Sequence, residues 1–168
     1  MDNKVVQTVF TTLLELDFIT VKFNFRGVGQ SEGTFAHGAG ETEDAVAVTQ
    51  AIREQFGNHF ADLPLLLAGF SFGGAVQLFA AKELAPEFLI LIAPSVAKLN
   101  APMIPGTTQC ALIIQGDKDD IVLSREVLAW AEPASQPVVV IPGAGHFFHG
   151  KLMMLRRLIW KYFSERTQ

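Results

Sequence analysis

Segments of helical periodicity alternate with short apolar runs along most of the chain. Apolar residues recur three or four positions apart in five segments, which predicts amphipathic helices at residues 3–16, 41–56, 72–84, 123–131 and 150–164. Five runs rich in β-branched and other apolar residues predict strands at residues 18–25, 64–70, 88–93, 110–115 and 137–142. Glycines crowd the sequence RGVGQSEGTFAHGAGE after the first strand, which predicts a long loop.

The order of these elements predicts the fold class. Strands that are buried on both faces of a parallel sheet have continuous apolar sequences. The five predicted strands have such sequences and are mostly separated by predicted helices. We therefore expect an α/β fold in which a mostly parallel sheet of about five strands is covered by helices on both faces. No repeat, low-complexity segment or linker divides residues 1–168, so we expect one domain. Open parallel sheets bind ligands beyond the carboxyl ends of their strands, which is where a site is expected.

Composition and charge narrow the possible partners. The 168 residues are 49% apolar and 18% charged, which suits one well-buried core. The net charge is −4 and the only adjacent basic pair is Arg156–Arg157, so we expect a small-molecule substrate and neither nucleic acid nor a membrane as partner. Cys110 is the only cysteine and the first ten residues do not resemble a signal peptide, so we expect a cytoplasmic location.

Three kinds of polar side chain follow strands of the predicted sheet. Ser71 lies in GFSFGG, three aspartates lie in QGDKDDIV, and His146 lies in PGAGHFFHG. A serine hydroxyl becomes a nucleophile when an imidazole takes its proton and a carboxylate holds that imidazole. The sequence therefore predicts Ser71 as nucleophile and His146 as general base.

The glycines around Ser71 support a tight turn from strand to helix. We expect side chains at positions 69 and 73 to collide with neighbouring elements, and the turn to hold Ser71 above the sheet. It also aims the backbone N–H of Phe72, at the start of the next helix, toward a developing oxyanion. The alternative is a purely structural Ser-Gly turn that lets the helix pack closely on the sheet.

The sequence does not favour a metal site or a dinucleotide site. His146 and His149 are spaced like a metal-binding pair, but no third ligand follows at a sensible spacing, so we expect no metal. Gly27, Gly29 and Gly33 hint at a dinucleotide fingerprint, but that motif requires glycine at Glu32. We therefore expect no cofactor.

At this point the chain resembles the α/β-hydrolases over essentially its whole length. The order Ser, Asp, His and the G-x-S-x-G sequence from Gly69 to Gly73 are similar to the pattern of that superfamily. The segment GDKDDIV resembles the G-x-x-D-x-x-V segment that carries the triad acid, which implies Asp119, with Asp117 and Asp120 as alternatives. The segment FNFRGVGQSEG is similar to the D-x-R-G-x-G-x-S segment after the fourth strand.

More narrowly, the chain resembles small lidless bacterial serine hydrolases. About sixteen residues separate the strands at 88–93 and 110–115, which leaves no room for a lid domain. In such relatives a sequence like MDNKVV is preceded by several strands and by a His-Pro-rich loop that resembles the usual source of the second oxyanion donor. The resemblance therefore implies an N-terminally truncated hydrolase fold. Losing one donor costs about 3 to 4 kcal/mol of transition-state stabilisation, so we expect impaired activity.

The resemblance also predicts a gap in the sheet. In the parent fold the strand just upstream lies between those that correspond to residues 18–25 and 64–70. Either these two strands pair directly, or the sheet retains a slot whose unpaired backbone groups must find water or another chain.

Two functions remain open from the sequence. The first is a serine hydrolase that acts on a carboxylic ester or thioester through an acyl-enzyme on Ser71. The second is a non-catalytic or incomplete α/β-hydrolase fragment with a structural or partner-binding role. For the hydrolase, we expect an open cleft that would suit a small or exposed acyl group, bordered by Phe35, Phe70, Phe72 and Phe147.

Overall fold

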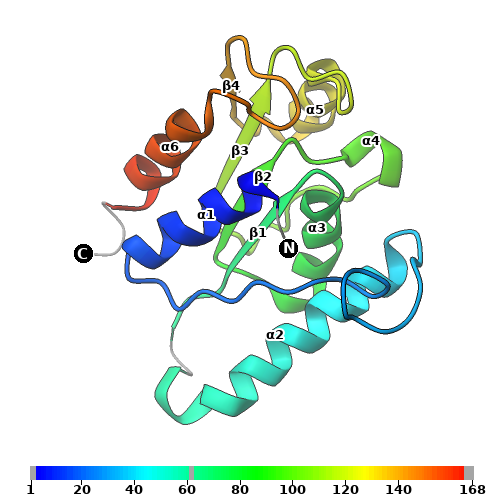
Figure 1. Cartoon of the computed structure of the whole chain (residues 1–168), viewed down its shortest axis with the longest axis vertical. Coiled ribbons are helices and arrows are strands. Elements are labelled where there is room, and N and C mark those ends of the chain that lie inside the picture. Colours follow the sequence, from blue (N-terminus) through cyan, green and yellow to red (C-terminus); the bar gives the residue numbers. More distant parts are fainter. Residues whose placement is uncertain (1–2, 61–62, 165–168) are drawn as a thin grey trace.

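Four parallel strands form the sheet of the computed structural model, which describes residues 3–60 and 63–164 (Figure 1). The strands lie side by side in the order β1-β2-β3-β4, and each adjacent pair is parallel. The elements follow the chain as α1 (Lys4–Glu15), α2 (Ala39–Phe60), β1 (Leu66–Phe70), α3 (Phe72–Leu84), β2 (Phe88–Ile92), α4 (Val96–Leu99), β3 (Cys110–Gly116), α5 (Ser124–Ala131), the 3-10 helix η1 (Glu132–Ala134), β4 (Val138–Ile141) and α6 (Leu152–Ser164).

The α/β fold class is confirmed, but the expected strand at 18–25 is wrong. Residues 18–25 belong to no strand, and β1 is an edge strand of the sheet. A β-branched and aromatic sequence favours extended backbone, but a strand also needs a hydrogen-bonding neighbour, which this segment lacks in the part of the chain described. Direct pairing of this segment with residues 64–70 is thereby excluded. Within the same ranges, none of the helices combines the length and apolar character that a membrane span requires.

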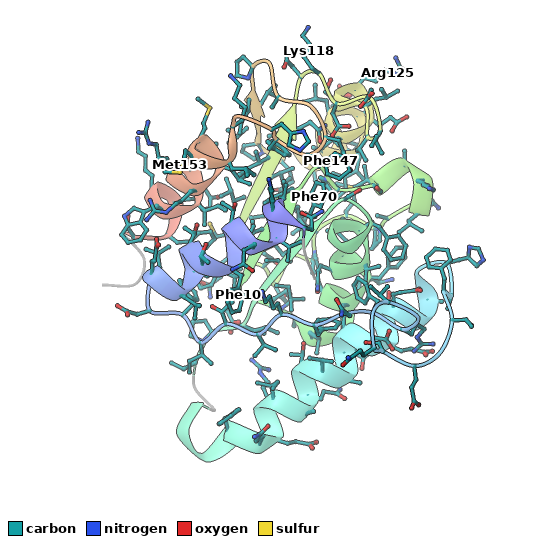
Figure 2. All side chains as sticks on the ribbon, viewed as in Figure 1. Phe10, Phe70, Lys118, Arg125, Phe147 and Met153 are labelled. Carbon is teal, nitrogen blue, oxygen red and sulfur yellow. The ribbon has the colours of Figure 1, made fainter. Side chains whose placement is uncertain are left out.

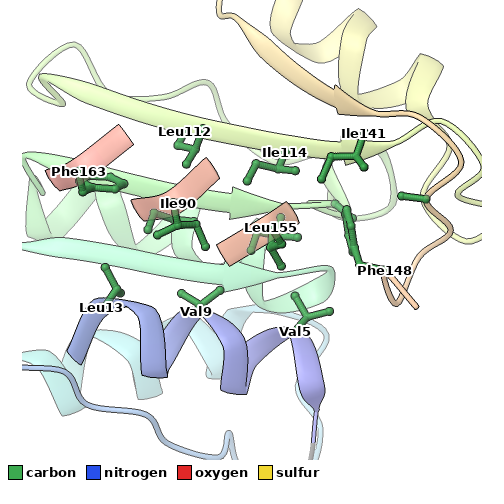
Figure 3. Packing of buried hydrophobic residues seen from close by; sticks show 14 of the residues in the cluster. Val5, Val9, Leu13, Ile90, Leu112, Ile114, Ile141, Phe148, Leu155 and Phe163 are labelled. Atoms are coloured by element: carbon green, nitrogen blue, oxygen red, sulfur yellow. The ribbon is translucent and has the colours of Figure 1, made fainter. Parts of the chain in front are cut away.

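Alternate residues of each strand face opposite layers of helices. On one face, the sheet packs against α1 and α6, and on the other against α2, α3 and α5. Figure 3 shows the first of these cores, where α1 and α6 lie against the middle of the sheet. Its fully or nearly fully buried members include Val5, Val9, Leu13, Ile90, Leu112, Ile114, Leu155 and Phe163. This two-sided burial explains why the strands read as continuous apolar runs.

The glycine-rich loop before α2 is anchored by carboxylates on the first turns of that helix. Glu41 is buried and accepts hydrogen bonds from the backbone N–H groups of Ala36 (2.8 Å) and Gly38 (2.7 Å). Burial alone would raise the pKa of Glu41, but these hydrogen bonds outweigh it and lower the pKa below its ordinary value of 4.5. Asp44 accepts hydrogen bonds from the backbone and the guanidinium of Arg26, which lower the pKa of Asp44 despite burial.

These contacts predict a pH-dependent effect of replacing Glu41 by Gln. The amide cannot accept both backbone hydrogen bonds, so near pH 7 the free energy of unfolding should fall by about 1–3 kcal/mol. The folded-state pKa lies below the unfolded value of 4.5, so the advantage of Glu41 is present above pH 4.5 and shrinks as the pH falls through the lowered pKa. Urea denaturation of both proteins across this range measures the difference. Glu43→Gln is the control, because that side chain is 75% exposed. If the loss of unfolding free energy in Glu41→Gln is the same at every pH, the prediction is contradicted.

Candidate active site

Ser71 stands on the turn that joins β1 to α3, in a backbone conformation that few residues adopt. Its φ is 53° and its ψ is −120°, and its hydroxyl makes no capping hydrogen bond to α3. The turn is tight because the strand and helix touch at glycines. A Cβ on Gly69 would lie 2.4 Å from the carbonyl oxygen of Gly73, and one on Gly74 would lie 3.1 Å from the Pro94 side chain. Gly69 is therefore required by sterics, as predicted.

The expected collision at position 73 is wrong. A Cβ on Gly73 would meet only the ring of Phe25, at an ordinary contact distance of 3.8 Å. The next glycine, Gly74, is the one that lies against neighbouring elements, since a Cβ there would lie 3.1 Å from Pro94 and 3.2 Å from the carbonyl oxygen of Gly69.

Three strand ends bring the hydroxyl, the imidazole and a carboxylate together. The Ser71 Oγ lies 2.9 Å from Nε2 of His146, and Nδ1 of His146 lies 2.8 Å from Oδ2 of Asp119. Asp119 and His146 are each only 5% exposed. An ionised carboxylate can only accept, so Nδ1 carries the proton that it donates to Asp119, and the Nε2 lone pair is left facing the serine hydroxyl. This arrangement can remove a proton from Ser71.

Asp119 is held by more than the histidine. Its Oδ1 accepts hydrogen bonds from the backbone N–H groups of Ile121 (2.9 Å) and Val122 (2.8 Å). The two neighbouring aspartates are exposed, and Asp117 instead accepts a hydrogen bond from the N–H of Gly143. Of the three aspartates considered from the sequence, only Asp119 is within hydrogen-bond distance of His146 in the structure.

The first N–H groups of α3, next to Ser71, have no acceptor within the helix. The Ser71 carbonyl oxygen accepts from the N–H groups of Gly74 (3.0 Å) and Ser95 (3.0 Å). Phe72 is the first residue of α3, so its N–H has no acceptor one turn earlier in the helix. The N–H lies at the positive end of the helix dipole, which favours negative charge.

Two polar residues beside the hydrogen-bonded residues Ser71, His146 and Asp119 were not predicted from the sequence. Gln115 is fully buried, and its side-chain amide donates to Oδ2 of Asp119 (3.2 Å) and to the carbonyl of Val122 (2.9 Å). Ser95 follows β2, and its Oγ lies 3.4 Å from the Oγ of Ser71. The available signals were a glutamine at the end of the apolar run CALIIQG and a serine at a strand's carboxyl end.

Two of the four aromatic rings that were expected around the site lie beside His146. Phe70 and Phe147 flank His146, with ring centroids 4.8 Å and 5.1 Å from the imidazole, and both lie at the same end of the sheet (Figure 2). Phe35 packs instead on Phe72, at 5.5 Å, and is 57% exposed. The four rings thus form two pairs.

The other histidines contribute to no metal site in the described ranges. His149 stacks on Phe147 and His37 packs against Phe35, while the side chain of His59 lies outside the described residues. No group of three or more His, Cys, Asp or Glu side chains that could hold a metal ion occurs among the residues described.

Comparison with known proteins finds similarity to a family model and to solved structures of serine hydrolases. The sequence model of the family described as serine aminopeptidase, S33 (Hydrolase_4) matches residues 3–111. An alpha-beta serine hydrolase homologue from Coxiella burnetii is 41% identical, with a TM-score of 0.81 over 96% of this chain and 76% of its own. A serine hydrolase without a lid from Xanthomonas campestris is 40% identical, with a TM-score of 0.87 over 99% of this chain and 75% of its own. An uncharacterized Rickettsia prowazekii protein is 31% identical over 96% of this chain and 71% of its own length.

The contact between Gly69 and the start of α3 predicts a strong stability effect. Gly69→Ala places a Cβ 2.4 Å from backbone atoms that cannot move without displacing the helix, so the free energy of unfolding should fall by about 3 kcal/mol. Gly106→Ala is the matched control, because nothing lies within 4 Å of a Cβ there, and its effect should stay within about 0.5 kcal/mol. Chemical denaturation of both variants measures the difference, and equal effects would show that the turn is not tight.

Proposed function

Because the chain belongs to the serine aminopeptidase S33 (Hydrolase_4) family of α/β serine hydrolases, we propose that it hydrolyses a carboxylic ester or thioester through an acyl-enzyme on Ser71. One observation carries the proposal: the continuous hydrogen-bonded chain from Ser71 through His146 to Asp119. In this proposal Ser71 is the nucleophile, His146 the general base and acid, Asp119 the triad acid, and the backbone N–H of Phe72 an oxyanion donor.

In the first half of the reaction, the ester or thioester acylates the serine. Nε2 of His146 takes the hydroxyl proton as the Ser71 Oγ attacks the carbonyl carbon, and a tetrahedral intermediate forms. Asp119 stabilises the imidazolium, and the Phe72 N–H donates to the oxyanion. The imidazolium then protonates the leaving oxygen or sulfur as its bond to carbon breaks, which leaves the acyl group on Ser71.

In the second half, water replaces the leaving group. His146 takes a proton from water, the hydroxide attacks the acyl carbon, and the second tetrahedral intermediate collapses when His146 returns the proton to the Ser71 Oγ. The products are a carboxylic acid and the regenerated serine.

The surroundings of the triad support a small apolar acyl group and slow turnover. Phe147 is 45% exposed and, with Phe70, offers apolar surface beside His146. Phe72 supplies the one oxyanion donor identified among the described residues. A missing donor typically lowers kcat by about 10²–10³, so we expect turnover well below that of a hydrolase with two donors.

Hydrolysis of short p-nitrophenyl esters tests the proposal. Ser71→Ala should abolish the activity above background, and His146→Ala should lower kcat by about 10³ or more. His149→Ala is the matched control, because its ring stacks on Phe147 and contacts neither Ser71 nor Asp119 in the described structure, and it should retain most of the activity.

Asp119→Asn should lower kcat by about 10²–10⁴, because an amide can present either a donor or an acceptor to Nδ1 and no longer fixes the tautomer. Wild-type protein that is folded yet hydrolyses no ester would favour the non-catalytic alternative. Activity that survives in Ser71→Ala would contradict the assigned nucleophile.

A further inference from the structure

The turn that carries Asp119 is built around the side-chain amide of one buried residue, Gln115. This turn, residues 116–122, leads from the end of β3 toward α5 (Figure 1). Gln115 is the last residue but one of β3 and is fully buried. Its Nε2 lies 2.9 Å from the carbonyl oxygen of Val122, 3.2 Å from Oδ2 of Asp119 and 3.3 Å from the carbonyl oxygen of Gly116. The turn therefore folds around Nε2, with acceptors one, four and seven positions after Gln115.

The chemistry of these partners fixes which way the Gln115 amide points. All three are oxygen acceptors, so the NH₂ group faces them, and an amide turned the other way would place Oε1 against three oxygens. Oε1 instead has no hydrogen-bond partner among the residues described. A buried oxygen without a partner costs free energy. A glutamine at this core position is therefore explained by its N–H donors, since an apolar side chain would avoid that cost.

The carboxylate of Asp119 depends on the Gln115 donor for the orientation of its plane. Two backbone N–H groups, those of Ile121 and Val122, donate to Oδ1. Oδ2 accepts from Nδ1 of His146 and from the Gln115 amide. Without Gln115, Oδ2 would be held, in the described part of the chain, only by the imidazole that it has to orient. The carboxylate could then turn about its Cβ–Cγ bond, which is a soft torsion.

We propose that Gln115 is a positioning residue that acts on the chemistry at Ser71 only through Asp119. Its amide holds Oδ2 of Asp119 at the place where Nδ1 of His146 donates to it. Because Gln115 is fully buried, it offers no surface to a substrate, so its effect falls on kcat and leaves KM unchanged. The kinetic part of this inference rests on the proposed ester hydrolysis, whereas the hold on the imidazole can be measured without turnover.

Replacing Gln115 by Met removes both donors and keeps an unbranched side chain of similar length. A hydrogen bond to a charged group corresponds to about a 10- to 100-fold change in rate, so kcat for a p-nitrophenyl ester should fall by that factor. KM should change by less than about twofold. Gln77→Met is the matched control, because Gln77 is also buried and forms no hydrogen bond with Ser71, His146 or Asp119 in the described structure. Its kcat should stay within about twofold of wild type.

The same substitution in the Asp119→Ala background separates positioning from a general effect on the fold. If Gln115 acts only through Asp119, Gln115→Met should lower kcat there by less than about twofold. An equal fall in kcat in the two backgrounds would show that Gln115 acts by another route, and the proposal would be overturned.

A second readout needs no substrate. In protein with ¹⁵N-labelled histidine, the Nδ1–H signal of His146 is assigned by its loss in His146→Ala, and its exchange with water is measured. Gln115→Met should speed this exchange at least about tenfold, because the carboxylate that accepts the proton is no longer held in place. Gln77→Met should leave the rate unchanged. An unchanged rate in folded Gln115→Met overturns the proposal, whatever the ester assays show.

The wild-type side chain keeps the inference testable if Gln115→Met does not fold. The NH₂ hydrogens of Gln115 should exchange with water slowly, and at least about tenfold faster in Asp119→Ala, where one acceptor is gone. Equal rates would mean that the amide does not hold Asp119, and the proposal would fail. Wild-type protein that passes the exchange measurements and hydrolyses no ester would instead overturn the proposed function, and the hold of Gln115 on Asp119 would stand.

Discussion

The whole site depends on one chain of hydrogen bonds, from the Asp119 carboxylate through the His146 imidazole to the Ser71 hydroxyl. These residues stand 27 and 75 positions apart along the sequence, so no local structure could align them. They meet because β1, β3 and β4 are parallel and end at the same edge of the sheet. The buried Gln115 and the amides after Asp119 then hold the carboxylate, which holds the imidazole.

Strand β1 carries both unusual features of this molecule. Its last residue, Phe70, directly precedes Ser71, and its edge that faces away from β2 has no neighbouring strand among the described residues. The close contact of Gly69 with α3 fixes β1 against one helix layer, while β2 supports only one of its two edges. Ser71 is therefore positioned by packing and by one neighbouring strand, where a residue at the end of a central strand would have two.

Much of the fold could be predicted because burial on both faces of the sheet leaves a clear periodicity. The helix expected at 72–84 was found at those bounds, and each end of the remaining strands and long helices lies within four residues of its predicted position. The strand at 18–25 failed because β-propensity reports a preference for extended backbone and says nothing about whether a neighbour exists. The short helices α4 and η1 were not predicted, since three or four residues carry no periodicity.

The candidate site was predictable to the extent that its residues follow strands. Ser71, the aspartate cluster and His146 could be found from their places after apolar runs, whereas the choice of Asp119 rested on a resemblance. Gln115 and Ser95 contact Asp119 and Ser71 only in the folded chain, so their positions in the sequence do not predict these contacts. Position 73 was misjudged for the same reason: which glycine touches a neighbour depends on the rotation of α3.

The most direct measurement is the location of a fluorophosphonate adduct on the folded protein, found by mass spectrometry of its peptides. Such a reagent reacts with a serine whose hydroxyl proton can be taken by a neighbouring base. We predict a single adduct on Ser71 that is lost when His146 is replaced by Ala. An adduct on Ser95, whose Oγ lies only 3.4 Å away, or no adduct on folded wild-type protein, would contradict the assignment.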